Sequence, residues 1–296
     1  MTPRPILATV SCLAALAAGT LHLLGAPPTG YSAIFAPRWV VPAAAAVGLV
    51  AIWLSGPARR PRVGVPTGWA AVVLLFWGAG GLALEGFRAF FAVTGIPAGE
   101  FAQVDVPGML TRALSALAAV ATVLYTWDVG REARPGAAGR RRWPRCLAVA
   151  MCVPYPSLKI YWWLGGTVGR PEPYTGGLPG MELALFAVGA LVALGLTGSL
   201  VEGRLRPVLL AAGWAGSTAA LTMGALMVFG TLAQLLGVSD GPVDLGAGAI
   251  TALVALTYGS WLAVGVALLA ATLQAHDGRR VLGHAPTGGR AERGVA

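Results

Sequence analysis

Residues 153–166 read VPYPSLKIYWWLGG and close an apolar segment that begins near Trp143. The segment is long enough to cross a bilayer, which takes about 20 predominantly apolar residues. It contains Lys159, which is the only lysine of the chain. All other residues counted under Lys+Arg are arginines. A charge near hydrocarbon is costly unless it pairs, faces water or reaches the interface. Lys159 is therefore a candidate functional residue.

The composition indicates a membrane protein. Of the 296 residues, 56% are hydrophobic and only 11% are charged, whereas charged residues make up about 25% of an ordinary soluble domain. The apolar residues form long unbroken runs, which indicate helices. The net charge of +9 would also suit a nucleic-acid-binding protein, but the arginines lie in the loops between apolar runs. The positive-inside bias explains that placement, so nucleic acid is not an expected partner.

The apolar runs predict an all-α fold with eight transmembrane helices in one domain, residues 1–274. We expect these helices near residues 6–24, 39–55, 68–91, 108–127, 143–164, 181–200, 207–236 and 246–272. Basic loops alternate with acidic or nearly neutral ones, which predicts that both termini are cytoplasmic. The first run also resembles a signal peptide, but it is long for one. Residues 275–296 are rich in Gly, Arg and Pro, and they predict a disordered cytoplasmic tail.

Two pairs of short sequences hint at a four-plus-four tandem repeat. Leu24-Gly25 and Leu164-Gly165 lie 140 positions apart, and Val104-Asp105 and Val243-Asp244 lie 139 positions apart. Both pairs fall in corresponding outer loops of the predicted topology. Four helices preserve orientation, so such a repeat would be parallel. Helices rich in Ala, Gly and Leu also align by chance, so both interpretations stay open.

The predicted topology places most ionisable residues of the helices on the extracytoplasmic side, where they indicate a polar pocket. These residues are His22, Glu85, Arg88, Arg112, Lys159 and Glu182. Glu85 and Arg88 are spaced i, i+3, so they share a helix face and can pair. The pair either joins helices or serves a site. If Lys159 faces Glu85, the three groups carry one net positive charge and suit an anionic head group. If Glu85 is instead desolvated, it becomes a candidate proton donor.

The segment around Lys159 allows two interpretations. Its ammonium could reach the outer interface along the flexible side-chain stem. Against this, Pro154 and Pro156 remove backbone donors and should break the helix, and broken helices at membrane depth line cavities. Tyr155, Lys159 and Trp162 are spaced i, i+4 and i, i+3, so all three should share one face.

Several aromatic residues are candidates for substrate binding. Trp162 lies at the expected outer boundary, where an interfacial aromatic belt is the simpler interpretation. Trp77, Tyr258 and Trp261 lie deeper. Aromatic faces stabilise a carbocation or an ammonium by cation–π attraction, although filling of the core explains each ring equally well.

The sequence offers no motif for a metal or a cofactor, and we expect neither. It contains no H-E-x-x-H, paired-cysteine, P-loop or G-x-S-x-G pattern. The three cysteines, Cys12, Cys146 and Cys152, lack metal or redox spacing and are expected to pack as small apolar residues.

The pattern Tyr155-x-x-Leu158-Lys159-x-x-Trp162-x-Leu164-Gly165-Gly166 resembles a segment of actinobacterial eight-helix membrane proteins, most of them uncharacterised. In size and helix number the chain is also similar to small integral-membrane terpene cyclases. This second resemblance implies a buried acid that protonates an isoprenoid olefin or epoxide.

These observations lead to a hypothesis of a bacterial inner-membrane enzyme that acts on a lipophilic, isoprenoid-type substrate. The specific reaction would be acid-initiated cyclisation, with Glu85 as proton donor and with Lys159 and Arg88 tuning it or holding a polar head. The residues expected to bind or shield the substrate are His22, Trp77, Arg112, Tyr155, Trp162, Tyr258 and Trp261. The alternatives are a transporter component and a non-catalytic membrane subunit.

Overall fold

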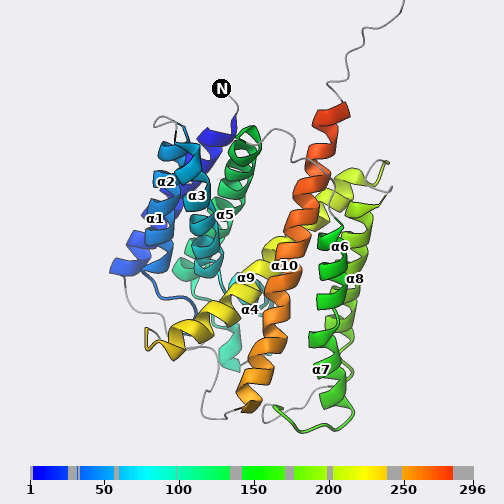
Figure 1. Cartoon of the computed structure of the whole chain (residues 1–296). Helices are drawn as coiled ribbons and strands as arrows, with labels where there is room; N and C mark the ends of the chain where they lie inside the picture. Colours follow the sequence, from blue (N-terminus) through cyan, green and yellow to red (C-terminus); the bar gives the residue numbers. More distant parts are fainter. Residues whose placement is uncertain are drawn as a thin grey trace, which may run out of the picture.

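Figure 1 shows the computed structural model of the chain, which contains helices and no strand within the residues that it describes. These are residues 3–25, 32, 34–56, 60–97, 99–133, 142–170, 177–198, 203–238 and 249–282. In chain order the helices are α1 (Pro3–Leu24), α2 (Val40–Ser55), α3 (Pro61–Gly78), α4 (Leu82–Thr94), the 3-10 helix η2 (Gly99–Ala102), α5 (Val106–Glu132), α6 (Trp143–Met151), α7 (Pro154–Trp163), α8 (Gly180–Thr197), α9 (Arg206–Leu235) and α10 (Ala249–Leu282).

The all-helical prediction is confirmed, and several helices suit a multi-pass membrane protein. Within the described residues, six segments are long and apolar enough to cross a bilayer: Arg4–Leu24, Pro61–Thr94, Val106–Glu132, Gly180–Thr197, Arg206–Leu235 and Thr257–His276. The apolar helix α2 is shorter. Eight spans with two cytoplasmic termini go beyond this count and stay a prediction.

The first residues of the predicted disordered tail are helical. Residues 275–282 were expected to belong to a disordered tail, but they continue α10 as far as Leu282. Arg279, Arg280 and Leu282 are residue types with high helix propensity, which favours this continuation. The rest of the predicted tail, residues 283–296, lies outside the described residues.

The predicted span at residues 68–91 lies within the apolar segment Pro61–Thr94, but the structure interrupts the helix of this segment. α3 ends at Gly78 and α4 begins at Leu82. Gly81 adopts φ of +84°, a left-handed conformation that L side chains rarely adopt. The ring of Phe35 lies against Gly81, and its atoms would be 2.8 Å from a Cβ added there. The break separates α4, which carries Glu85, from α3.

Replacing Gly81 by alanine should therefore lower the thermal unfolding midpoint, Tm, of the detergent-solubilised protein by about 5 °C. The new methyl group would have to adopt a left-handed backbone and displace the Phe35 ring. Gly86→Ala in α4 is the control, because nothing lies within 4 Å of its added Cβ. Alanine is also the better helix former, so the Gly86 variant should keep or raise the Tm. Equal Tm values for the two variants would contradict this account of the break.

The predicted helix at residues 143–164 is also divided, as its prolines indicated. α6 ends at Met151, and α7 begins at Pro154 after Cys152 and Val153. Pro154 and Pro156 have no backbone N–H, so two hydrogen bonds of a continuous helix cannot form. Pro154 instead occupies the first turn of α7, where the missing donor costs least.

The helices form two groups with the same order of neighbours (Figure 1). In the first group α1 packs against α2 and α5, and α3 also packs against α2 and α5. In the second group α6 packs against α8 and α10, and α9 also packs against α8 and α10. A tandem repeat would produce this arrangement, but the repeat stays a prediction, and its marker Val243-Asp244 lies outside the described residues.

Helix α9 joins the two groups. It packs along α10 and also contacts α3, α4 and α5 of the first group. Leu221 and Ala225 of α9 belong to the core formed by α1, α2, α3 and α5, whereas Ala220 belongs to the core formed around α6, α8 and α10. The mutual position of the two groups therefore depends on α9.

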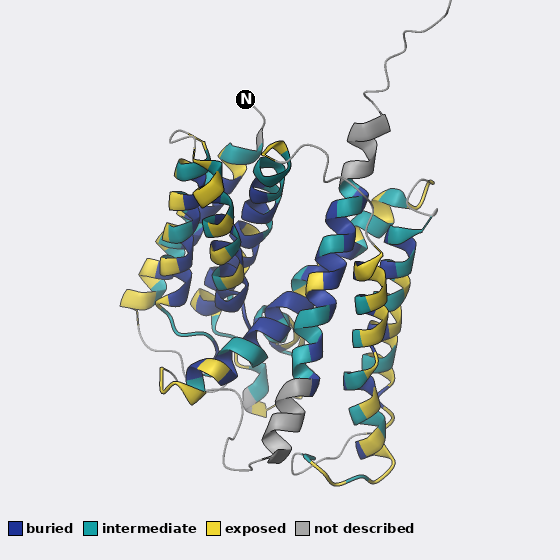
Figure 2. Ribbon diagram, viewed as in Figure 1, coloured by how far each residue is buried: buried dark blue, intermediate teal, exposed yellow. Residues whose placement is uncertain are grey.

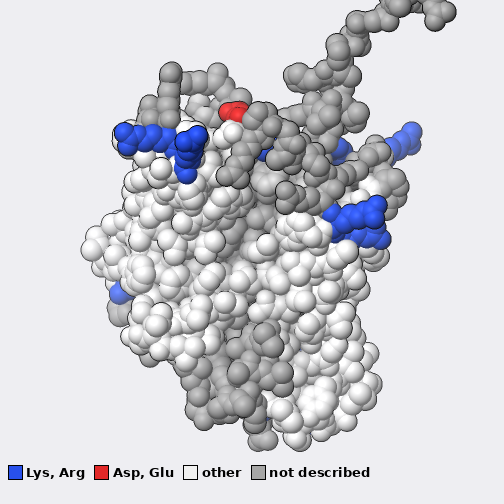
Figure 3. All heavy atoms as spheres, viewed as in Figure 1, with Lys and Arg blue, Asp and Glu red and all other residues white. Residues whose placement is uncertain are grey.

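The outer faces of the helices are apolar, as lipid contact requires. Figure 2 shows exposed residues along the outer side of α8, where Met181, Leu185, Val188 and Leu191 form one exposed stripe. In the view of Figure 3 the charged side chains gather mostly at the end that carries the N-terminus, and the flank below them is nearly uncharged. A water-soluble protein rarely exposes apolar stripes of this length, whereas a bilayer accommodates them.

Helix α4 has its polar residues inside and its apolar residues outside. Glu85 and Arg88 are buried, whereas Phe87, Phe90 and Val93 are exposed. In water this orientation would be unfavourable, because two charged groups lose their hydration while three large apolar side chains stay exposed to solvent. Next to hydrocarbon it is the favourable orientation, because charged groups then face the protein. The orientation of α4 therefore supports contact between its outer face and lipid.

Candidate functional site

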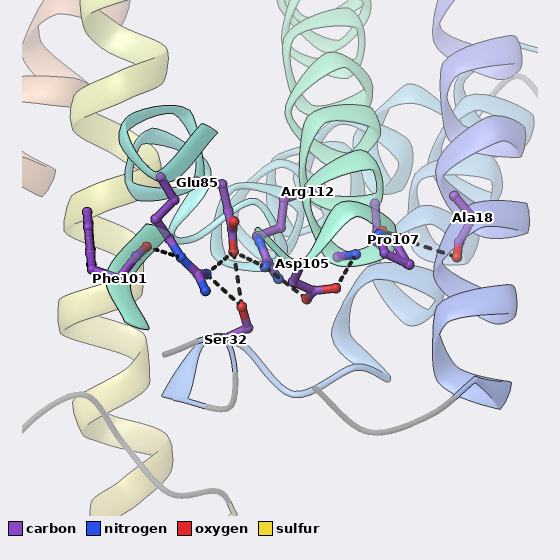
Figure 4. A network of polar contacts seen from close by, with 10 residues as sticks. Ala18, Ser32, Glu85, Phe101, Asp105, Pro107 and Arg112 are labelled. Carbon is purple, nitrogen blue, oxygen red and sulfur yellow. Dashed lines mark hydrogen bonds and ion pairs between the residues drawn. The ribbon is translucent and has the colours of Figure 1, made fainter. Parts of the chain in front are cut away.

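Glu85 lies at the centre of a buried network of charges. Its side chain has no solvent exposure, and its Oε1 accepts hydrogen bonds from Arg88 Nη1 at 2.7 Å, Arg112 Nη2 at 2.6 Å and Ser32 Oγ at 3.1 Å. The i, i+3 spacing of Glu85 and Arg88 predicted their ion pair, which the structure confirms. Figure 4 shows how α4, α5 and the segment at Ser32 converge here. We call Ser32, Glu85, Arg88, Asp105 and Arg112 the Glu85 centre.

Arg88 connects the centre to its surroundings. Its Nη1 also donates to Ser32 Oγ at 2.8 Å, and its Nε donates to the carbonyl oxygen of Phe101 in η2 at 3.1 Å. Ser32 therefore accepts from Arg88 and donates to Glu85. These contacts fix the guanidinium from two sides, so the position of Arg88 depends on both α4 and η2.

Asp105 holds the start of α5 next to Arg112. Its Oδ1 accepts from the backbone N–H of Gly108 at 3.0 Å, which makes Asp105 the N-cap of α5. Its Oδ2 lies 3.3 Å from Arg112 Nη2. A Cβ at Gly108 would lie 2.0 Å from Asp105 Oδ2, so glycine is required for this approach. The Arg112 guanidinium also lies over the Phe35 ring, 4.6 Å from its centroid.

Replacing Asp105 by two different residues separates its two roles. Asp105→Asn keeps the capping oxygen and removes the charge, whereas Asp105→Ala removes both. We expect the alanine variant to unfold with about 1 kcal/mol less free energy than the asparagine variant, which is the usual value of an N-cap. Chemical denaturation of both variants in the same detergent measures this difference. Equal stabilities would show that the cap contributes nothing.

Two buried polar atoms of the Glu85 centre have no hydrogen-bond partner among the described residues. They are Glu85 Oε2 and Arg112 Nε. The first accepts hydrogen bonds and the second donates one. An unsatisfied buried group costs about 1–3 kcal/mol, and more when it is charged. Glu85 Oε1 thus has three donors, whereas Glu85 Oε2 remains an open acceptor and Arg112 Nε an open donor.

The charges of the centre balance. Glu85 and Asp105 contribute two carboxylates, and Arg88 and Arg112 contribute two guanidiniums. Buried ion pairs contribute little to stability relative to apolar packing, because desolvation offsets the attraction, but removal of one partner is strongly destabilising. A neutral, tightly paired centre is therefore expected to tolerate the substitution of a single charged member poorly.

Lys159 is not part of the Glu85 centre. It lies in α7, which packs against α8 and α10, and its Nζ lies 5.5 Å from the centroid of the Tyr155 ring and 5.1 Å from that of Trp162. These contacts confirm that Tyr155, Lys159 and Trp162 share one helix face. Glu182 of α8 lies within electrostatic reach of the ammonium. The expected anionic head group depended on Lys159 facing Glu85, so this placement removes its basis.

Three of the predicted substrate-binding residues, Tyr155, Tyr258 and Trp261, form a cluster with Phe186 in the second group of helices. The ring centroid of Tyr155 lies 5.4 Å from that of Phe186, 5.2 Å from that of Tyr258 and 5.1 Å from that of Trp261. Phe186 and Trp261 are 4.9 Å apart. The rings stack or meet edge to face, the geometry of a packed aromatic core. We call Tyr155, Phe186, Tyr258 and Trp261 the aromatic cluster.

Trp162 is buried rather than placed in an interfacial belt. It is 2% exposed, and its Nε1 donates to the carbonyl oxygen of Val168 at 2.9 Å. Its neighbours Tyr161 and Trp163 are exposed instead. The belt interpretation therefore fits these two neighbours but not Trp162, because Trp162 faces the protein on the same side as Lys159.

His22 and Trp77 lie in the first group of helices. His22 is half-buried at the end of α1, within electrostatic reach of Asp105, Arg112 and Arg38, so it borders the Glu85 centre. Trp77 packs between Trp39 and Phe229, with ring centroids 6.3 and 6.2 Å away. Its indole Nε1 is buried and has no partner among the described residues.

Sequence reasoning missed three contacts around Glu85. These are the hydrogen bonds of Ser32, the Phe35 ring beneath Arg112, and the ion pair of Asp105 with Arg112. Ser32 and Phe35 lie between α1 and α2, where no periodic pattern assigns a direction to a side chain. Asp105 had a usable signal, because an Asp directly before an apolar run, with Pro107 in the first turn, is typical of a helix N-cap. Glu182, expected near Glu85, lies near Lys159 instead.

Comparison with known proteins gives no assignment for the chain: no family model matches it, and neither a curated protein nor a solved structure is significantly similar.

Proposed function

We propose that the chain is a multi-pass membrane protein that holds the polar head of a lipophilic, isoprenoid-type substrate at the Glu85 centre and acts on that substrate as an enzyme. The observation that carries the proposal is the fully buried Glu85, whose Oε2 has no partner among the described residues. A structural ion pair alone has no need of an unsatisfied oxygen. The lipid-facing surface of α4 supports a substrate that arrives from the bilayer.

Glu85 is best suited to accept a hydrogen bond from the substrate. Its Oε1 is occupied by donors from two guanidiniums and a hydroxyl, which is how an ionised carboxylate is held. Acid-initiated cyclisation would require a proton on Oε2 beside these two cations. We therefore place acid-initiated cyclisation second to a role in which Glu85 stays ionised and positions the substrate.

A transporter is the alternative function, and the broken helices α3–α4 and α6–α7 favour it. However, the breaks occur in the third helix of one group and the first helix of the other, and transporters with repeats break corresponding helices. Buried Ser115, Thr122 and Thr126 extend from the Glu85 centre along α5. Ser115 donates to the Leu75 carbonyl oxygen, and Thr122 contacts Cys12, so these hydroxyls join helices rather than line a pathway.

Topology completes the proposal. In the view of Figure 3 the described Lys and Arg side chains gather mostly at the end of the molecule near the N-terminus. Positive residues mark the cytoplasmic side of bacterial membrane proteins. We propose that both termini are cytoplasmic and that the Glu85 centre lies in the extracytoplasmic half of a bacterial inner membrane.

Incubation of isoprenoid alcohols and epoxides with membranes that contain the protein tests the proposed activity. The wild type should form a new product, which product analysis by mass spectrometry detects. Glu85→Gln combined with Arg88→Gln removes the open carboxylate while keeping the charge balance of the centre, and it should abolish the product at equal amounts of folded protein. Unchanged turnover by this double variant would contradict a role of the centre, and no product from the wild type would remove the enzyme hypothesis.

A further inference from the structure

We infer that the Glu85 centre selects a lipophilic alcohol, and that it takes the substrate through an uncharged hydroxyl rather than through a diphosphate, carboxylate or ammonium group. The inference rests on the proposed function and specifies its substrate class. It depends on which atoms of the centre are unsatisfied and on the charge that the centre already contains.

The two unsatisfied atoms match the two capacities of one hydroxyl. Glu85 Oε2 needs a donor, and Arg112 Nε–H needs an acceptor. A hydroxyl group donates one hydrogen bond and accepts up to two. Glu85 and Arg112 are already joined through Oε1 and Nη2 at 2.6 Å, so the open atoms belong to two directly paired groups. A single hydroxyl therefore has both the donor that Glu85 Oε2 lacks and the acceptor that Arg112 Nε lacks.

The charge balance argues against charged heads. With two carboxylates and two guanidiniums, the centre has no net charge to offset that of a guest. A diphosphate or carboxylate would meet the open Glu85 oxygen as a like charge, and an ammonium would be brought next to two guanidiniums. A buried charge without compensation is costly, whereas a hydrogen-bonded hydroxyl is not.

The position of the centre suits a guest with a long apolar chain. Glu85 and Arg88 occupy the inner face of α4, and Phe87, Phe90 and Val93 occupy its outer face. A helix is about 10 Å across, so only the thickness of α4 separates the centre from the apolar surface. The chain of an alcohol whose hydroxyl binds Glu85 would therefore have to extend past α4, over about the width of one helix, to reach lipid.

Thermal unfolding of the detergent-solubilised full chain with four probes tests the inference. The probes are farnesol, a short-chain diacylglycerol, farnesyl diphosphate and farnesylamine. We expect an alcohol at about 100 times its Kd to raise the Tm by about 5 °C. A rise in Tm with either alcohol supports recognition through a hydroxyl. A rise with farnesol alone indicates an isoprenoid alcohol as the substrate, and a rise with diacylglycerol alone indicates a glycerolipid.

Arg112→Lys locates the effect, because lysine keeps the positive charge and removes the Nε–H. It should abolish the shift caused by the alcohol. Arg4→Lys is the matched control, since Arg4 pairs with Asp128 at the opposite end of α5, and this variant should keep the shift. An alcohol shift that survives Arg112→Lys would overturn the inference, because the alcohol would then bind elsewhere.

The remaining outcomes separate the inference from the proposed function. In one outcome farnesyl diphosphate or farnesylamine raises the Tm, the alcohols do not, and Arg112→Lys abolishes the rise. This result would overturn the inference that the centre takes an uncharged hydroxyl, but it would leave binding at the centre intact. No shift with any probe would overturn both the inference and the proposed function.

Discussion

Glu85→Gln is expected to reduce the free energy of unfolding by about 3–5 kcal/mol, the usual result when one partner of a buried ion pair is removed. The substitution leaves Arg88 and Arg112 buried, at 3% and 6% exposure, without the carboxylate that joins them. In a thermal unfolding experiment this corresponds to a decrease in Tm of about 10 °C.

Two further variants make this prediction specific. Glu182→Gln makes the same chemical change at the first turn of α8, where the side chain is only half-buried, and it should cost less than about 1 kcal/mol. Glu85→Gln combined with Arg88→Gln restores the balance of charges, so it should recover part of the lost Tm. If Glu85→Gln were as stable as Glu182→Gln, the centre would not be the paired network described above.

Gly224→Ala is expected to have a similarly large effect, because it acts on backbone atoms. A Cβ at Gly224 would lie 2.2 Å from the backbone nitrogen of Leu262 and 2.5 Å from its Cα. Backbone cannot move aside as a flexible side chain can, so α9 and α10 would have to separate. Overpacking costs about 1–3 kcal/mol in ordinary cores, and we expect the upper end of that range here because α9 also joins the two groups of helices.

Gly259→Ala is the matched control in the same interface. Its Cβ would meet only Val228 Cγ2, at an ordinary contact distance of 3.7 Å. Its Tm should stay within about 2 °C of the wild type, while Gly224→Ala loses about 5 °C or more. Equal losses in the two variants would show that the close approach of α9 and α10 does not control stability.

The apolar runs located the helices well, because each span must present a long apolar surface to lipid. They located the breaks less well. Pro154 and Pro156 announced the division of α6 from α7, since proline lacks a backbone donor. The break before α4 was missed, because Gly80 and Gly81 are equally typical of close helix packing in membranes. Only the φ of Gly81 distinguishes a turn from a packing contact.

The candidate site was predictable where it depended on one helix and unpredictable where it depended on several. The spacing of Glu85 and Arg88 gave their ion pair, and the spacing of Tyr155, Lys159 and Trp162 gave their shared face. Whether Lys159 meets Glu85 depends on which helices are neighbours, which periodicity does not encode. The sequence suggested that Lys159 and Glu85 could meet. Because α7 packs against α8 and α10, Lys159 instead lies in the second group of helices, apart from Glu85.

The separation leaves two places where a lipophilic substrate can be sought, the Glu85 centre and the aromatic cluster. The centre offers unsatisfied polar atoms, whereas the rings of the cluster contact one another at 4.9–5.4 Å. Trp261 Nε1 of the cluster also has no hydrogen-bond partner among the described residues, but of the two places only the centre has both an open acceptor, Glu85 Oε2, and an open donor, Arg112 Nε.

Photo-crosslinking with a diazirine-bearing farnesol analogue, followed by mass-spectrometric mapping of the labelled peptides, tests the central claim most directly. The Glu85 centre predicts labels within residues 82–115, which include α4, η2 and the start of α5, and excess unlabelled farnesol should compete them away. Labels confined to α7, α8 and α10 around the aromatic cluster, or labels that farnesol does not compete, would contradict it.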